Sequence, residues 1–264
     1  MPIRLPHCTV QRATAPSPEH DVPLLVVKPT ASARPSEQTP GILWIHGGGY
    51  VTGMFQMVFM SRALRLVQRY GAMVASPTYR PAPKHPYPAA LHDCYAALRY
   101  LVDHADELGV NSNQIMVGGE SAGGGLAAAL CLYARDRSEV AIAYQMPLYP
   151  MIDDRDTASS RDNHAPVWNT RRNHRAWKAY LGDIEPFYCE TLAYVERLRE
   201  AGVEAAVDVY PGCFHAFDML LPFKWVSKQA IAAFEERYRY AVAHYFAPQP
   251  TNTASGQVDH RPME

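Results

Sequence analysis

The chain has 264 residues, of which 48% are hydrophobic and 19% charged, and its 25 basic and 26 acidic side chains nearly balance. This composition supports one domain with a substantial core, and the dispersed basic residues argue against nucleic-acid and anionic-membrane binding. Five cysteines without a Cys-x-x-Cys pair argue against a zinc site and a disulfide framework, and a reducing cytoplasm fits them best. Because the chain has no apolar leader and no stretch of about 18 apolar residues, we expect neither secretion nor membrane spanning.

The N-terminal part of the chain alternates short apolar runs with turns. Extended segments at 8–13 and 22–28, a Pro/Ser-rich linker at 29–40 and an apolar run at 41–45 predict an opening β-meander. The segment His46-Gly47-Gly48-Gly49 ends the last of these runs. Glycines there leave backbone N–H groups bare, and such donors can stabilise the oxyanion of a tetrahedral acyl intermediate.

Helices and strands alternate along the rest of the chain. The predicted elements are a helix near 57–70, a strand at 72–78, a helix from 88 to about 108, strands at 113–118, 141–147 and 205–210, and helices from 124 and at 224–246. Such alternation predicts a mainly parallel sheet covered by helices on both faces. We assign 1–247 to a single domain and expect 248–264 to form a disordered tail.

A serine between two glycines marks the candidate centre of activity. In Gly119-Glu120-Ser121-Ala122-Gly123 the predicted strand at 113–118 turns into a helix, which is typical of a nucleophile elbow whose strained backbone exposes the hydroxyl. His215 lies on a turn directly after the run at 205–210 and follows the serine in chain order, as hydrolases with this elbow require. Ser121 and His215 are therefore the candidate nucleophile and base.

These motifs resemble those of the hormone-sensitive-lipase-like branch of the α/β-hydrolases, a group of bacterial esterases and their relatives. The match spans roughly 22–246. It includes the block Tyr79-Arg80-Pro81-Ala82-Pro83-Lys84, in which Pro81 and Lys84 depart from the family's Tyr-Arg-Leu-Ala-Pro-Glu sequence. It also includes Leu148-Tyr149-Pro150-Met151 and Val167-Trp168-Asn169, the latter within a lid-like segment at about 152–182.

The resemblance implies an α/β-hydrolase fold and a serine carboxylic ester hydrolase. By motif, Ser121 is the nucleophile, His215 is the general base and then the acid, and the N–H groups of Gly48, Gly49 and Ala122 form the oxyanion hole. It implies no metal or organic cofactor, because the neighbouring base activates the nucleophile. The implied partner is a small-molecule ester, and the oligomeric state stays open.

The triad acid is the weakest part of the match. The family usually places Asp-Pro-Leu or Asp-Pro-Phe after an apolar strand, and the nearest match here is Glu185-Pro186-Phe187, with Asp183 as the second candidate. Either carboxylate can orient an imidazolium. The expected penultimate strand is missing, because a predicted lid helix at 172–180 runs directly into this motif. A third interpretation is that both acids are solvated loop residues.

Two further expectations concern function. Relatives usually carry N-terminal helices over the active site, and this chain has almost nothing before Cys8, so we expect open pockets that favour small or short-chain acyl esters. The alternative is a catalytically impaired, hydrolase-like ligand-binding protein. His164 and His174 belong to no His-Glu-x-x-His pattern and are not expected to bind metal. The natural substrate, and whether the short form is natural or truncated, stay open.

Overall fold

A mostly parallel sheet runs through the centre of the structure. The computed structural model describes residues 7–30, 39–153, 160–161, 163–164, 168–180 and 188–250. Within these ranges the strands are β1 (Cys8–Ala15), β2 (Val22–Pro29), β3 (Thr39–Ile45), β4 (Met73–Pro77), β5 (Val110–Glu120) and β6 (Tyr144–Leu148). Their order is β1-β2-β4-β3-β5-β6, with antiparallel pairing among β1, β2 and β4 and parallel pairing from β4 through β6.

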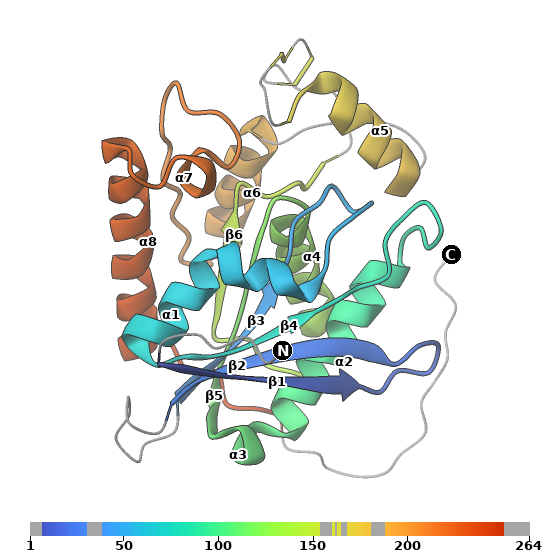
Figure 1. The fold of residues 1–264 in the computed structure, drawn as a ribbon, viewed down its shortest axis with the longest axis vertical. Helices are drawn as coiled ribbons and strands as arrows, with labels where there is room; N and C mark the ends of the chain where they lie inside the picture. The colour runs from blue at the N-terminus through green and yellow to red at the C-terminus, as the bar shows by residue number, and fades with distance from the viewer. Residues whose placement is uncertain are drawn as a thin grey trace.

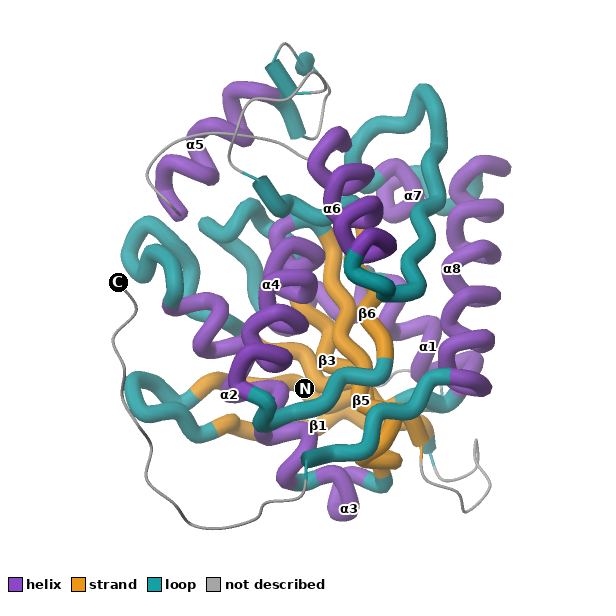
Figure 2. The backbone as a smooth tube through the Cα atoms, turned by 180° about the vertical axis from the view of Figure 1, so that it is seen from behind, coloured by secondary structure: helices purple, strands orange, loops and turns teal. Residues whose placement is uncertain are grey.

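Helices cover both faces of this sheet, as Figures 1 and 2 show. In chain order the described helices are the 3₁₀ helix η2 (Phe55–Met60), α1 (Arg62–Tyr70), α2 (Ala89–Asp103), α3 (Ala105–Leu108), α4 (Ala122–Arg137), α5 (Thr170–Tyr180), α6 (Tyr188–Glu200), α7 (Phe217–Leu220) and α8 (Trp225–His244). The predicted architecture, a mainly parallel sheet between helical layers, is confirmed.

The side-chain alternation of the central strands explains the two layers. Successive residues of a strand point to opposite faces. In β3, Leu43 and Ile45 pack into the cluster that contains α2 and α4, whereas Ile42 and Trp44 pack into the cluster that contains α1 and α8. The Trp44 ring meets Phe234 of α8 edge-on, with 6.2 Å between ring centroids. A continuous apolar run therefore becomes a strand buried on both faces.

The predicted β-meander is only partly right. β1 and β2 form an antiparallel pair, but the neighbour of β2 is β4 and not β3. β3 pairs in parallel with both β4 and β5. A parallel neighbour needs a crossover, which η2 and α1 provide, so β4 returns between β2 and β3.

Two predicted helices are each divided into two. The predicted helix at 57–70 consists of η2 and α1, and Ser61 separates them because its Oγ caps α1 by accepting the N–H of Ala63 at 3.1 Å. The predicted helix at 88–108 consists of α2 and α3, which meet at His104. At Ser61 the boundary is set by capping chemistry, which apolar periodicity does not register.

The predicted strand at 205–210 is wrong. The chain between α6 and α7 runs between β6 and α8 (Figures 1 and 2), but residues 203–210 have no strand assignment. A strand needs a hydrogen-bonded neighbour, and in the described ranges β6 pairs with β5 alone. The predicted absence of a penultimate strand concerns the segment just before Glu185, which lies largely outside the described residues, so it stays a prediction. Within the described ranges, one side of β6 is a sheet edge.

The division into a domain at 1–247 and a tail at 248–264 stays a prediction, since 251–264 and parts of the lid-like segment lie outside the described residues. Gln249 is described, and its Nε2 donates to the carbonyl oxygens of Ser112 and Ala141 at 2.8 and 2.9 Å. No helix in the described ranges combines the length and apolar character needed to cross a membrane.

Candidate active site

Ser121 stands at the sharp turn between β5 and α4. Its backbone has φ 58° and ψ −121°, a strained conformation for a residue with a side chain. The turn is held by the Ser121 N–H, which donates to the Leu148 carbonyl at 2.9 Å. A Cβ on Gly119 would collide with the Gly123 carbonyl, and one on Gly123 would collide with the Ile45 carbonyl. The glycines of the motif therefore permit the close approach that the predicted elbow needs.

The structure brings His215 to this serine. His215 Nε2 lies 2.9 Å from Ser121 Oγ, although the two residues are 94 positions apart. The half-buried imidazole meets the Tyr149 ring edge-on at 4.8 Å and lies 6.2 Å from the Trp168 ring. If Nε2 accepts the serine proton, Nδ1 carries the ring proton, which is the tautomer that a general base requires.

Burial keeps this histidine neutral. Desolvation lowers the pKa of His215 to about 4, while the negative charge of Asp218 acts in the opposite direction. The imidazole is therefore ready to accept a proton at neutral pH. The imidazolium that forms during acyl transfer needs nearby negative charge, because burial disfavours it.

A buried ion pair anchors the chain just beyond the histidine. Asp218, in α7, is 3% exposed, and its Oδ2 accepts a hydrogen bond of 2.9 Å from Arg62 Nε. The Arg62 backbone N–H also donates to Glu120 Oε1 of the elbow at 3.3 Å. One residue of α1 thus connects the segment with the serine to the segment with the histidine. Sequence analysis missed Asp218 and Arg62, although a carboxylate three positions after His215 is a usable signal.

Glu120 is a buried carboxyl group beside the nucleophile. Desolvation raises its pKa to about 7, against the hydrogen bonds that it accepts from Trp44 Nε1 and the Arg62 N–H. Near neutral pH it therefore exchanges between the acid and the carboxylate.

The loop after β3 presents bare backbone donors. Gly48 and Gly49 have φ values of 120° and 61°, and a Cβ on Gly48 would collide with the Thr52 carbonyl. A Cβ on Gly47 would lie 3.3 Å from Ser121 Cβ, which places this loop against the elbow. Along the described chain, no protein acceptor takes the N–H groups of Gly48 and Gly49.

The third predicted donor comes from the elbow itself. Ala122 is the first residue of α4, and N–H groups in a helix's first turn have no partner within the helix. The positive end of the helix dipole lies at the same place, and it favours negative charge. The arrangement therefore suits a developing oxyanion, and the assignment of Gly48, Gly49 and Ala122 stays a prediction.

His46 has a structural environment. It is buried, its Nδ1 lies 2.7 Å from the Gly47 carbonyl oxygen, and its ring stacks on Tyr79 with 4.2 Å between centroids. Burial lowers its pKa to about 4, so it is neutral. It supports the glycine loop as a packed, uncharged ring.

The candidate acids Glu185 and Asp183 lie outside the described residues, so their relation to His215 stays a prediction. Trp168, which the sequence places in the lid-like segment, has its ring against Gly49 and near His215. Its Nε1 donates to Asn173 Oδ1 at 2.8 Å. His, Cys, Asp and Glu side chains form no cluster of three suited to a metal ion within the ranges described.

Comparison with known proteins identifies the family. A sequence model described as the alpha/beta hydrolase fold matches residues 42–185. The chain belongs to this family. The hormone-sensitive-lipase-like branch inferred from its motifs is likewise confirmed. This α/β-hydrolase is 30% identical over 247 residues to an AB hydrolase superfamily protein of Schizosaccharomyces pombe, in a match that covers 78% of this chain and 71% of the relative.

Named esterases are among the similar proteins. Esterase LipI of Mycobacterium tuberculosis is 35% identical over 150 residues, covering 56% of this chain and 47% of LipI. The α/β-hydrolase chain thus spans about half the length of that relative. Among solved structures, a bacterial heroin esterase superposes with a TM-score of 0.82 at 31% identity, covering 91% of this chain and 86% of that one. These similarities extend from the sequence to the fold.

The pKa of Glu120 predicts a pH-dependent stability. A folded-state pKa of about 7, above the ordinary 4.5, stabilises the fold at low pH, and this contribution is lost as the pH rises from 4.5 through 7. The Glu120→Gln variant has no ionisable group at this position, so it does not lose this contribution as the pH rises. Urea unfolding at pH 5 and pH 8 should therefore show the wild type losing stability relative to Glu120→Gln at the higher pH.

Glu235 provides a control of opposite sign. Burial alone would raise its pKa, but hydrogen bonds from Tyr70 and Arg65 lower it below 4.5. Its stabilisation is present above pH 4.5 and is lost only as the pH falls through and below that value, so the stability difference between the wild type and Glu235→Gln should hardly change between pH 5 and pH 8. Equal pH dependence of the two variants would contradict the assignment of Glu120.

The electrostatics of His215 give a second prediction. An NMR titration of its ring should give a pKa below the ordinary 6.5, and Asp218→Asn should lower it further, because the charge that favours the imidazolium is removed. A His215→Gln spectrum assigns the signal. Glu235→Gln is the matched control, since it also removes a buried carboxylate that pairs with an arginine of α1. A His215 pKa that is unchanged in Asp218→Asn would refute this role.

Proposed function

We propose that this α/β-hydrolase is a serine carboxylic ester hydrolase with a Ser-His-acid triad. The observation that carries the proposal is the 2.9 Å contact between His215 Nε2 and the hydroxyl of Ser121, at a backbone turn whose φ is positive. A hydroxyl held in this way has its base within proton-transfer distance before any substrate binds. The named esterases among its relatives support the same reaction class.

The reaction proceeds in two halves. His215 takes the proton of Ser121 while the serine oxygen attacks the ester carbonyl, and the oxyanion accepts hydrogen bonds from the N–H groups of Gly48, Gly49 and Ala122. His215 then gives its proton to the leaving alcohol. A water molecule, deprotonated by His215, attacks the acyl-enzyme and releases the acid. No cofactor takes part in either half.

A carboxylate completes the triad, and we keep Glu185 as the first candidate and Asp183 as the second. The charge of Asp218 supplements this carboxylate by favouring the imidazolium. An unoriented histidine loses the correct tautomer, which costs on the order of 10⁴ in turnover in serine proteases. Where this acid is poorly placed, catalysis by the oxyanion donors would remain.

We propose small or short-chain acyl esters as the substrates, and a small-molecule ester as the partner. The names of two relatives support this choice. An ethyl acetate hydrolase of Pseudomonas putida is 26% identical over 244 residues, covering 80% of this chain, and an acetyl esterase of Salmonella paratyphi A is 32% identical over 197 residues.

Steady-state hydrolysis of p-nitrophenyl butyrate tests the proposal. Ser121→Ala and His215→Ala should each lower kcat by roughly 10³-fold or more, and the double variant should lose little beyond the single ones, because the pair acts as a unit. Ser138→Ala is the matched control, since Ser138 also has a positive φ, of 53°, but is exposed at the end of α4. It should keep full activity.

Equal turnover by the wild type and Ser121→Ala would reject the esterase. The alternative, a hydrolase-like ligand-binding protein, would then explain the fold better.

A further inference from the structure

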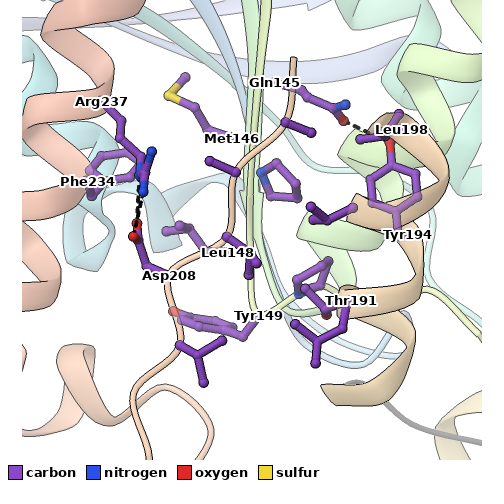
Figure 3. Close-up of a pocket in the computed structure, with 18 of the residues that line it drawn as sticks. Gln145, Met146, Leu148, Tyr149, Thr191, Tyr194, Leu198, Asp208, Phe234 and Arg237 are labelled. Atoms are coloured by element: carbon purple, nitrogen blue, oxygen red, sulfur yellow. Dashed lines mark hydrogen bonds and ion pairs between the residues drawn. The ribbon is translucent and has the colours of Figure 1, made fainter. Parts of the chain in front are cut away.

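A cavity of about 1170 Å³ lies along the sheet edge at β6. Figure 3 shows its walls: Gln145, Met146 and Leu148 come from β6, Tyr194 and Leu198 from α6, and Phe234 and Arg237 from α8. The extended chain at 203–210 forms the outer wall. The space exists because that chain makes no strand beside β6. Its volume is somewhat larger than the usual range for small-molecule sites, about 300–1,000 Å³.

Apolar side chains of β6, α6 and α8 line much of the cavity, and two of its polar pairs are internally satisfied. Tyr194 Oη donates to Gln145 Oε1 at 3.1 Å, and Arg237 Nε donates to Asp208 Oδ2 at 2.8 Å. The Arg237 hydrogen bond lowers the pKa of Asp208, so both members of this pair are charged and neutralise one another. These two pairs therefore offer little to a polar guest, whereas burial of apolar surface against the side chains of β6, α6 and α8 is favourable.

The cavity reaches the candidate active site on one side only. His215 and its ring neighbour Tyr149 belong to its lining, as do Phe214 and Trp168. None of the lining residues described is Gly48, Gly49 or Ala122. The cavity therefore meets the site at the base and not at the predicted oxyanion donors.

The mechanism of acyl transfer indicates which part of the substrate lies on the His215 side of the site. In the tetrahedral intermediate the carbonyl oxygen faces the oxyanion donors, and the leaving oxygen must be within hydrogen-bond reach of the histidine that protonates it. A space that begins at His215 is therefore beside the leaving alcohol. Substituents of that alcohol can extend from His215 along β6.

We infer that this cavity binds the alcohol portion of the substrate, and that the preferred esters join a short acyl group to a large apolar alcohol. The inference rests on the proposed function. The ester C–O bond breaks, the alcohol leaves with the proton from His215, and water supplies the hydroxyl of the released acid. The large fragment then occupies the cavity as the product alcohol.

Hydrolysis of 1-naphthyl acetate and ethyl acetate tests the inference, because the two esters differ only in the alcohol. Leu198→Trp fills the cavity from α6, and Ala206→Trp fills it from the outer chain, where 206 is exposed and tolerates a larger side chain. Each should lower the kcat/KM ratio of naphthyl to ethyl acetate by about tenfold. Ala193→Trp, on an exposed position of α6 outside the lining, should leave the ratio unchanged.

A binding measurement separates this site from catalysis. Calorimetry with 1-naphthol and the Ser121→Ala protein should detect binding that weakens about tenfold when Leu198→Trp or Ala206→Trp is added. Turnover of ethyl acetate together with an unchanged ratio and unchanged naphthol binding in both filled variants would overturn the inference and leave the proposed function intact. Absence of turnover with either ester would overturn the proposed function, and with it the role of the cavity in substrate binding.

Discussion

The buried ion pair between Arg62 and Asp218 is the interaction on which the candidate site depends most. Residues 203–210, which lead to His215, lie outside the sheet, so no strand ladder fixes the histidine from that side. The anchor is instead beyond it, where Arg62 holds Asp218 while its backbone holds Glu120 of the elbow. Both side chains of the pair are nearly buried, at 11% and 1% exposed. Removal of one partner from such a pair costs about 3–5 kcal/mol, because the remaining charge is left buried without compensation.

Local sequence was sufficient for the parts of the site in which backbone geometry is dictated by residue type. The glycines around Ser121 and at Gly48 and Gly49 mark turns that side chains would block, and strand alternation follows from apolar runs. Sequence failed where the structure depends on distant partners. The run at 205–210 is apolar enough for a strand but has no neighbour to pair with, and the Arg62–Asp218 pair joins residues 156 positions apart. Neither local segment contains a pattern that predicts the pairing of Arg62 with Asp218.

The open edge of β6 and the cavity have the same cause. An edge strand exposes backbone groups that invite pairing with other chains. Here α6 and the extended chain cover the edge at a distance, and Pro147 removes one donor from the strand itself. The covering leaves space because it packs through side chains such as Tyr194 and Arg237 rather than through a backbone ladder. Because residues 203–210 form no strand beside β6, a cavity remains there and extends to His215, the proposed base.

The same burial that forms the site also opposes its chemistry. His46 and His215 are both desolvated, and the pKa of each is lowered to about 4. A lowered pKa does not oppose the role of His46, because this residue supports the glycine loop as a packed, neutral ring. In the proposed mechanism His215 becomes charged during each half of the reaction, and a buried imidazolium without compensation is costly. The negative charge of Asp218, in α7, supplies part of that compensation because it favours the charged imidazolium. In the proposed mechanism the rate therefore depends on the negative charge placed near His215 as well as on the serine and the glycines.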